Sequence, residues 1–479
     1  MQKLYFITGS QDLYGEETLR QVAEDTKKMT AFLDEKLRDV VNIVWQPTVL
    51  NSEGIVEVCR RASNDEECVG VITWMHTFSP AKMWIKGLQL LTKPLLHLHT
   101  QVNEKLPYDA IDMDFMNLNQ AAHGDREYAF ICARLGIKRE VVVGYYQHED
   151  VIAKIRQFAE VAKAIAFSKE LKVGMFGSNM REVAVTDGDR VESQIRYGWE
   201  VNYYGIGDLA ELAGQVTEEE TDAKMAAYEA EYDMNTDNLA AVREQAKYEV
   251  ALERFVAEHG IGAFTDTFQD LHGFSQLPGL AVQRMMAKGF GFAAEGDYKT
   301  AALNAVLFEM AKHRKGATGF MEDYTYDLTP GSELVLAAHM LEVSPVFADN
   351  KPKVEVHPLG IGGKNPPARL VFDGTQGDAV AVCMTDMGDR FRLVAAEIEL
   401  VKQPQPMPNL PVARVMWKLK PDFKTGAAAW LYAGGGHHTV VSTALTMEDL
   451  RLFAKLTDTE LVVIDEDTKL DELQRQLGI

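Results

Sequence analysis

Four short segments in the second half of the chain bring carboxylates, imidazoles and glycines together. They are AAEGDYKTAAL (293–303), GFMEDYTYD (319–327), AAHMLEVSP (337–345) and YAGGGHHT (432–439). Their candidate ligands are two glutamates and three histidines: Glu295, Glu322, His339, His437 and His438. Two carboxylates with two imidazoles suit Mn²⁺ or a similar divalent ion, and a site without thiolates is not a structural zinc site. Four protein ligands would leave two positions of an octahedral ion for two adjacent substrate oxygens.

Each segment also has a purely structural interpretation. Asp297 is typical of a helix N-cap, with Glu295 solvated beside it. Glu322 and Asp323 are typical of an exposed acidic pair. His339 lies in the apolar context LAAHMLEV, which is typical of a core histidine whose hydrogen bonds are satisfied.

The adjacent histidines after three glycines, His437 and His438, are the strongest single signal. Successive glycines let the backbone approach another group closely. No segment decides the matter alone, so the metal-site hypothesis depends on all four together.

Other common catalytic motifs are not favoured. GSQDLYGEE (9–17) follows a predicted strand but does not match GxGxxG, and no GxxxxGK[ST] pattern occurs in the sequence. The glycine-rich LGIGG (359–363) lacks a following helix. No GxSxG elbow supports hydrolase chemistry.

Composition narrows the class of protein. The formal charge of −22 argues against a nucleic-acid surface and discourages an anionic membrane as partner. No uninterrupted apolar run is long enough to span a membrane, and the N-terminus lacks the apolar core of a secretory signal. The four cysteines fit no zinc spacing, so we expect reduced thiols in a cytoplasmic protein.

The elements that must position these residues are predicted to be of two kinds. The 479 residues suggest about three domains at roughly 150 residues each. In the first third, strands predicted at 3–8, 41–46, 69–74, 94–100 and 141–146 alternate with amphipathic segments such as 16–37 and 151–167. The pattern restarts at 171–177 and 200–206, followed by an acidic, alanine-rich helical region from 211 to about 260. Such alternation favours doubly wound parallel sheets.

Beyond residue 312 the pattern changes. Strands are predicted in close succession at 353–356, 368–372, 379–384, 390–400 and 413–419, with turns rich in Gly and Asp. Helices are predicted at 447–456 and 469–477. The predicted fold class is therefore α/β: two doubly wound, Rossmann-like units followed by a mostly antiparallel β domain. The expected domains are 1–170, 171–317 and 318–479.

Laid out in order, these segments resemble the L-arabinose isomerase family along essentially the whole chain. The motifs that carry the resemblance are long and specific: GSQDLYGEE, WMHTFSPAKMWI (74–85), FMNLNQAAHGDREY (115–128), FGSNMREVAVTDGDR (176–190), DTFQDLHGFSQLPGLAVQR (266–284), EGDYKTAAL, FMEDYTYD, HMLEVSP, VEVHPLGIGGK (354–364) and AGGGHHT.

The resemblance implies an aldose–ketose isomerase that converts L-arabinose to L-ribulose through an enediolate, with D-galactose to D-tagatose as a second reaction and a place at the first step of L-arabinose catabolism. It implies metal ligands at Glu295, Glu322, His339 and His438, with the two glutamates also as the acid/base pair. The implied cofactor is one Mn²⁺ per subunit, with Co²⁺ or Mg²⁺ as substitutes.

The resemblance also implies a sugar pocket and an assembly. Positions matching the pocket lining are Gln11, Leu13, Phe78, Met180, Phe268 and His437. Gln120 and His123 match residues contributed by a neighbouring subunit in a homo-hexamer of two stacked trimers. Local departures from the family pattern are Tyr298 where Trp is common, Asp327 where His is common, and Gly436 where Ala is common; none removes an expected ligand.

Two other functions share parts of this pattern. An isomerase of the related L-fucose type would share the architecture and metal logic, but GSQDLYG and AHGDREY favour the arabinose type. A non-catalytic sugar-binding protein would also use tandem α/β units, yet it would not need two glutamates with paired histidines.

Overall fold

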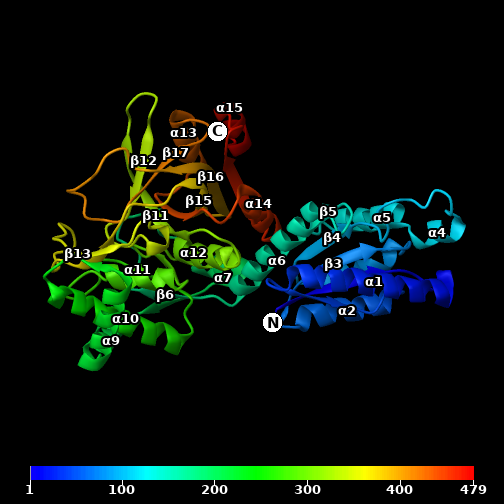
Figure 1. Ribbon diagram of the computed structural model, residues 1–479, viewed down its shortest axis with the longest axis horizontal. Coiled ribbons are helices and arrows are strands. Elements are labelled where there is room, and N and C mark those ends of the chain that lie inside the picture. Colours follow the sequence, from blue (N-terminus) through cyan, green and yellow to red (C-terminus); the bar gives the residue numbers. More distant parts are fainter. Residues whose placement is uncertain (1) are drawn as a thin grey trace. The chain divides into compact units, whose positions relative to one another are not determined.

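The computed structural model describes residues 2–479, and the chain divides into two compact units. The N-terminal unit is the chain up to Ala166 together with Lys455–Asp458. The larger unit comprises Phe167–Ala454 and Thr459–Ile479. Figure 1 labels the elements of both.

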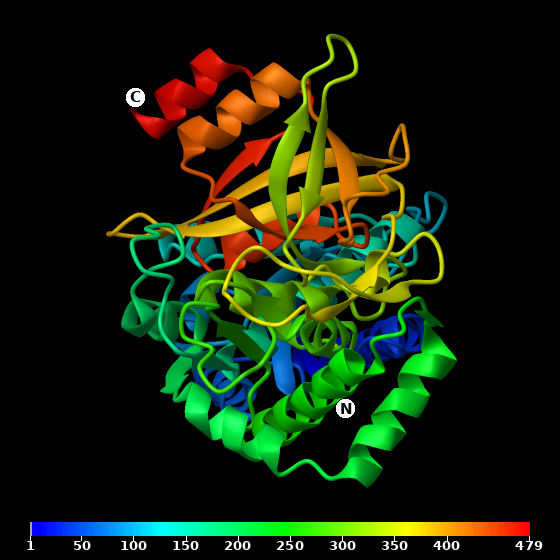
Figure 2. The same ribbon diagram turned by 90° about the vertical axis from the view of Figure 1, so that its left-hand side faces the viewer.

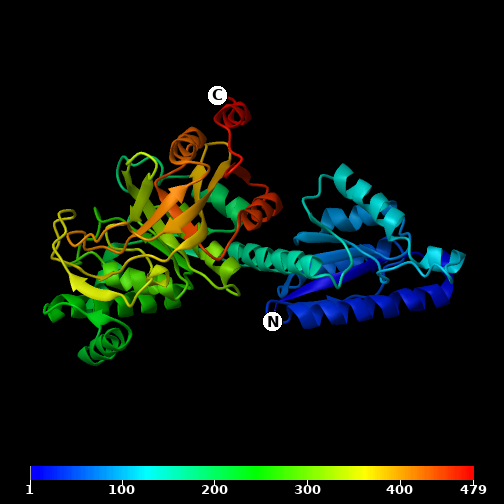
Figure 3. The same cartoon turned by 45° about the horizontal axis from the view of Figure 1, so that its top comes forward.

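The N-terminal unit is built on a parallel five-stranded sheet in the order β2-β1-β3-β4-β5. Every residue of the central strand β3 is buried, as expected where helices cover both faces of a sheet. Figure 3 shows helices on both sides of it. The strands are β1 (Lys3–Gly9), β2 (Asn42–Trp45), β3 (Cys68–Met75), β4 (Leu95–His99) and β5 (Glu140–Val143). The helices are α1 (Gly15–Leu37), α2 (Ser52–Asn64), α3 (Ile85–Leu90), α4 (Met113–Leu118), α5 (Ala121–Arg134) and α6 (Glu149–Lys169), with short 3₁₀ turns η1 (Asp12–Tyr14) and η2 (Ala81–Trp84).

The doubly wound prediction for this part of the chain is confirmed, with one boundary corrected. The strand predicted to reach residue 146 ends at Val143, because Gly144 has a φ of 140°, outside the range of a strand.

The larger unit begins with a second parallel sheet, of four strands in the order β10-β9-β6-β7. Its strands are β6 (Lys172–Phe176), β7 (Glu200–Tyr204), β9 (Ala263–Asp266) and β10 (Gly291–Ala293). Its helices are α7 (Arg190–Tyr197), α8 (Ile206–Gly214), α9 (Glu218–Glu231), α10 (Leu239–His259), α11 (Gly279–Ala287) and α12 (Tyr298–Ala311). The acidic, alanine-rich region forms α8 to α10, and a capping box between Thr217 and Glu220 begins α9.

A seven-stranded sheet, ordered β15-β18-β11-β12-β17-β16-β19, follows. Its strands are β11 (Thr318–Asp327), β12 (Leu334–Ala338), β15 (Gly377–Asp386), β16 (Phe391–Val401), β17 (Val415–Leu419), β18 (His438–Ser442) and β19 (Glu460–Ile464). All pairings are antiparallel except β16 with β19, so the predicted mostly antiparallel character is confirmed. The remaining helices are η3 (Pro345–Phe347), α13 (Phe423–Ala433), α14 (Met447–Leu456) and α15 (Leu470–Leu477). Figure 2 shows the β11–β12 hairpin rising from this sheet, with α13 and α15 side by side.

Two strands expected in the antiparallel run lie elsewhere. β13 (Lys353–Val356) and β14 (Ala368–Val371) form a separate three-stranded sheet with β8 (Asp233–Met234), which is paired parallel to β13. Val354 and Leu370 are fully buried in the core beneath it, which explains the location of this small sheet.

Helix α12 packs between the four-stranded parallel sheet and the seven-stranded sheet of the larger unit. It contacts β6, β9 and β10 of the parallel sheet and β11, β15 and β18 of the antiparallel sheet. Twelve of its 14 residues are buried, most of them apolar, as expected of a helix enclosed between two sheets. Its first turn is therefore held rigidly between the strands that carry the candidate site.

Two further findings bear on the expectations from composition. Within residues 2–479, no helix has the length and apolar character needed to cross a membrane. Cys59, Cys68, Cys132 and Cys383 are all buried free thiols.

Candidate functional site

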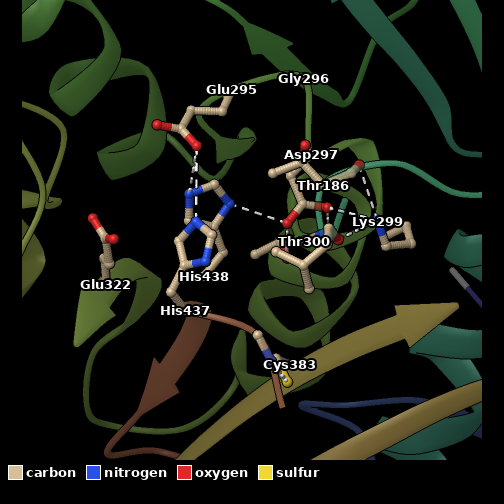
Figure 4. A network of polar contacts seen from close by, with 12 residues as sticks. Thr186, Glu295, Gly296, Asp297, Lys299, Thr300, Glu322, Cys383, His437 and His438 are labelled. Carbon is tan, nitrogen blue, oxygen red and sulfur yellow. Dashed lines mark hydrogen bonds and ion pairs between the residues drawn. The ribbon is translucent and has the colours of Figure 1, made fainter. Parts of the chain in front are cut away.

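Strand pairing in the antiparallel sheet brings the C-terminal candidate residues together. Glu322, in the middle of β11, lies opposite His438 at the start of β18 and opposite Ala338 at the end of β12. His339 follows Ala338 directly, so one strand position fixes a glutamate between two histidines. Figure 4 shows Glu295 above His437 and His438, facing their rings, with Glu322 to the left of the rings and Asp297 to their right. Glu322 is thus held on a strand.

Glu295 comes from the turn between β10 and α12, and its backbone is unusual. Its φ is 64°, which few residues other than glycine adopt. The next residue is Gly296, with a φ of 78°, where a Cβ atom would lie 2.4 Å from the Cα of Asn179. The amide of Met180 donates to the Glu295 carbonyl at 2.9 Å. This turn is therefore determined by close packing against the segment that follows β6.

The ligand atoms converge. Ligand atoms of Glu295, His339 and His438 all lie within 4.8 Å of one another. The Nε2 atoms of His437 and His438 are each 3.8 Å from Glu295 Oε2. Glu322 lies beside this group, with Oε2 3.9 Å from His339 Nε2. The structure thus brings three of the four expected ligands into one cluster and places the fourth against it.

A second carboxylate stands behind each buried histidine. His438 Nδ1 lies 3.1 Å from Asp297 Oδ2, and His339 Nδ1 lies 2.5 Å from Glu342 Oε2. Because an ionised carboxylate can only accept, Nδ1 is assigned the proton in both rings. The Nε2 atom of each ring is then left as an acceptor that faces the cluster. This carboxylate–histidine arrangement is typical of metal-binding imidazoles.

Electrostatics in the cluster favour a cation. Burial would lower the pKa of His339, but the nearby carboxylates of Glu342, Glu322 and Glu295 outweigh burial and raise that pKa above its ordinary value. The pKa of Glu295 is lowered, chiefly by its interaction with His437 and against the effect of burial. Burial would raise the pKa of Asp297, yet Lys299 and His438 hold that pKa well below its ordinary range. The same negative potential that favours a proton here favours a metal ion.

The donor set fits a divalent ion. His438 is 2% exposed, and its Nε2 is a buried atom without a hydrogen-bond partner. A buried polar atom without a partner costs free energy, which a ligand at that position would recover. One carboxylate and two imidazoles, with a second carboxylate adjacent, supply the oxygen and nitrogen donors that Mn²⁺ prefers.

The structural interpretations of these segments are partly right. Asp297 does cap α12, because its side chain accepts from the Thr300 amide at 3.2 Å, and it also contacts His438. His339 is a core histidine with a satisfied Nδ1, and it also belongs to the cluster. Glu322 is not an exposed residue, since its side chain is 21% exposed.

The residues expected to line a sugar pocket divide between the two units. Met180, Phe268 and His437 belong to the larger unit, as do the cluster residues. Phe268 packs against the small apolar cluster of Leu271, Leu277 and Leu341. The N-terminal unit holds the others: Gln11, Leu13, Phe78, Gln120 and His123.

Within the N-terminal unit, several of these residues gather where strands end and α5 begins. Phe78 stacks on His123, with ring centroids 5.1 Å apart, and the Gln120 amide donates to the His76 carbonyl at 2.9 Å. Leu13 is 83% exposed.

Sequence reasoning missed several residues around the cluster. Glu342, behind His339, stands in an apolar segment with nothing in the sequence to mark it. Asp297 was recognised only as a cap. Lys299 is fully buried beside Asp297, and a lysine in EGDYKTAAL carries no sequence signal of burial.

One departure from the family pattern has a structural consequence. Gly436, Val185 and His437 line a cavity of about 330 Å³. A Cβ atom at position 436 would lie 2.9 Å from Val185 Cγ2, so an alanine there requires Val185 to move. Tyr298 is fully buried, and Asp327 accepts from the Thr329 amide in the exposed hairpin turn.

Comparisons with known proteins identify the family of this chain. Three family models match in order: the L-arabinose isomerase N-terminal domain over residues 1–170, the central domain over 172–313 and the C-terminal domain over 317–460. Curated L-arabinose isomerases from Geobacillus stearothermophilus and Geobacillus kaustophilus are each 51% identical over 99% of this chain and 97% of their own length. An L-arabinose isomerase from Thermotoga sp. (strain RQ2) is 51% identical over 99% of this chain and 96% of its own.

Such identity along nearly the whole length, with family models for each third of the chain, leaves no part of the fold outside the comparison. The chain belongs to the L-arabinose isomerase family and is an aldose–ketose isomerase.

Proposed function

We propose that this protein converts L-arabinose to L-ribulose with a divalent metal ion, with Mn²⁺ as the expected ion and Co²⁺ or Mg²⁺ as substitutes. The same site is proposed to convert D-galactose to D-tagatose as a second reaction. The protein is proposed to act in the cytoplasm, at the first step of L-arabinose catabolism. The observation that carries the metal proposal is the convergence of Glu295, His339 and His438, with the buried Nε2 of His438 lacking a partner.

In this proposal, Glu295, His339 and His438 hold the ion, and Glu322 completes the set from β11. When bound, the ion supplies Lewis-acid stabilisation of the negative charge that develops on two adjacent sugar oxygens. Asp297 and Glu342 keep the two imidazoles in the tautomer and orientation that leave Nε2 free for it.

The proton transfers are assigned to the two glutamates. One carboxylate removes the C2 proton of the ring-opened aldose and returns it to C1 through an enediolate. The other moves the hydroxyl proton between the two oxygens. Their surroundings differ, because Glu295 lies beside His437 and His438, while Glu322 lies beside His339. Distinct acid and base roles require two carboxylates in different surroundings.

The sugar pocket is proposed to be shared between subunits of a homo-hexamer built as a dimer of trimers. Met180, Phe268 and His437 would bind sugar from the larger unit, and Gln11, Leu13 and Phe78 would line the same pocket. Gln120 and His123 would come from a neighbouring subunit. The proposal rests on the resemblance of these positions to the family, whose models cover all of them.

A ketose assay tests the proposal. L-arabinose, L-fucose and D-galactose are each incubated with the protein as purified, after chelation, and after chelation followed by Mn²⁺. We expect L-ribulose to form fastest, chelation to abolish it and Mn²⁺ to restore it. Full turnover in protein shown by elemental analysis to contain no metal would end the metal proposal, and faster turnover of L-fucose would end the substrate assignment.

A further inference from the structure

A fully buried lysine lies directly behind the cluster. Lys299 is the second residue of α12, is 0% exposed, and extends its ammonium group towards three successive backbone carbonyls. Its Nζ donates to the carbonyls of Val185 at 3.1 Å, Thr186 at 3.0 Å and Asp187 at 2.6 Å. Figure 4 shows this ammonium beside Asp297.

The same ammonium forms an ion pair with the carboxylate that supports His438. Lys299 Nζ lies 3.3 Å from Asp297 Oδ1, while Asp297 Oδ2 contacts His438 Nδ1 at 3.1 Å. Asp297 is 2% exposed. Removing one member of a buried ion pair leaves the other charge uncompensated in a poorly solvated place, which is costly. Neither charge is therefore expected to persist at this position without the other.

The carbonyls bound by Lys299 belong to the segment 179–187, which also contains Met180, a residue proposed to line the sugar pocket. The side chain of Asn179 donates to the carbonyls of Gly296 at 2.9 Å and Thr186 at 2.7 Å. The Met180 amide bonds the Glu295 carbonyl. Residues 179–187 are thus tied to the turn of Glu295 and Gly296 at one end, and to Lys299 at the other.

We propose that Lys299 is a positioning residue of the isomerase site: it holds the Asp297 carboxylate in place against His438 and holds residues 185–187 against α12. This inference rests on the proposed metal-dependent function. It assigns Lys299 no contact with the substrate or with the ion. Its effect passes through Asp297 to the orientation of the His438 ring.

This role makes a specific prediction for metal affinity. Lys299→Met nearly preserves the length of the side chain but removes its charge and its three donors. Without the ammonium, the Asp297 carboxylate loses the ion pair that orients it, and it holds the His438 ring less firmly. Because loss of a partner behind a metal-binding histidine typically lowers metal affinity about 10- to 100-fold, we expect that range for Mn²⁺.

The experiment measures Mn²⁺ dissociation constants by calorimetry on full-length, chelator-stripped oligomer. It compares wild type, Lys299→Met, Asp297→Asn and the double variant. If Lys299 acts through Asp297, Lys299→Met changes affinity by less than about threefold in the Asp297→Asn background. A larger change there, or wild-type affinity in folded Lys299→Met, overturns the inference. If Lys299→Met does not fold, the double variant, from which both buried charges are gone, decides between the two outcomes.

A matched control separates positioning from general stability. Lys163 is a buried lysine of the N-terminal unit whose Nζ donates to the Val40 carbonyl at 3.0 Å. Lys163→Met should lower the melting temperature and leave Mn²⁺ affinity unchanged. An equal loss of Mn²⁺ affinity in Lys163→Met would show that Lys299 affects the site only through the stability of the fold. Failure of the proposed function gives a different result, since wild type itself would then bind no Mn²⁺ and retain turnover without it.

Discussion

Both units of this protein place histidines against buried carboxylates, and, in the described part of the chain, only the larger unit also brings three potential metal ligands together. In the N-terminal unit a single carboxylate serves three donors: Asp125 accepts from His97 Nε2 at 2.9 Å, His99 Nδ1 at 2.7 Å and the Met75 amide at 3.1 Å. In the larger unit, His438 and His339 each have their own carboxylate, Asp297 and Glu342.

The difference lies in where the remaining ligand atoms point. Both carboxylate oxygens of Asp125 accept hydrogen bonds, and these bonds link α5 to β3 and β4. Behind His339 and His438, the supporting carboxylates turn two imidazoles towards the carboxylate of Glu295. Among residues 2–479, three or more ligand groups converge only at Glu295, His339 and His438. A search for histidines close to acidic residues would select both regions. Over the same residues, a search for converging ligand atoms selects only the cluster of Glu295, His339 and His438.

The sharpest test of this comparison removes a carboxylate that faces the cluster. Glu295→Gln or Glu322→Gln should lower turnover by at least about a hundredfold, the scale of losing a positioned acid or base. The oligomer and the cooperative melt should be unchanged, since Gln preserves the side-chain shape. Near-normal turnover in either variant would remove that glutamate from the mechanism.

Asp125 should behave in the opposite way. Asp125→Ala leaves the Met75 amide and two histidines without their acceptor inside the N-terminal unit. We expect a loss of about 3 kcal/mol in the local free energy of unfolding, the scale of removing one partner from a buried charged contact. Faster amide hydrogen exchange in β3 and β4 would report it by mass spectrometry.

Mn²⁺ affinity is the matched readout for that variant. It should equal that of wild type, because Asp125 supports structure rather than the cluster. Weakened Mn²⁺ binding with unchanged exchange in β3 and β4 would show that the distinction between the two regions is wrong.

In the proposed shared pocket, the N-terminal unit of one subunit contributes His123 to the site that contains Glu295 of a neighbouring subunit. His123→Ala retains an intact Glu295, and Glu295→Gln retains an intact His123, so each homo-oligomer should be nearly inactive. Co-expressed equally and assembled at random in a closed ring, about a quarter of the sites would combine two intact halves. Turnover near that fraction, in particles purified through tags on both chains, is the expected result. Mixed particles as inactive as their parents would place His123 in its own subunit's site.

The smallest expected effect concerns pH and His99. The hydrogen bond to Asp125 raises the pKa of His99, against the effect of burial. A raised pKa in the folded state means that the stabilisation is fully present below the unfolded histidine pKa of about 6.5 and is lost as pH rises through the folded value. The stability difference between wild type and His99→Gln in urea should therefore shrink from about pH 6 to about pH 8. A difference independent of pH would mean that His99 stays neutral.

Much of the fold was predictable because its local signals agree with its tertiary structure. The segment 353–356 was predicted as a strand and forms β13, and 447–456 was predicted as a helix and forms α14. Apolar periodicity decides such elements. What it could not decide was the pairing of β13 with β8, more than a hundred residues away, because strand partners leave no periodic mark in a single sequence.

The site divides in the same way. His437 and His438 were predicted from glycine context, and the ligand set came from a resemblance to a family rather than from spacing. Glu342 and Lys299 were not found, because their roles depend on burial. A glutamate three residues after His339 is unremarkable until the chain turns it back onto the imidazole.

The pairing of β11 with β18 has a consequence for how this protein can change. Glu322 faces the cluster because it stands opposite His438, and side chains along a strand alternate between faces. Deleting one residue between Thr318 and Glu322 would exchange the faces of Glu322 and Asp323. Asp323 would then face the histidines, and its side chain is one methylene group shorter than that of Glu322. Substitutions elsewhere in β11 leave that geometry intact. Variation in this strand should therefore proceed by replacement of residues, and libraries that insert or delete single codons here should yield folded, inactive proteins.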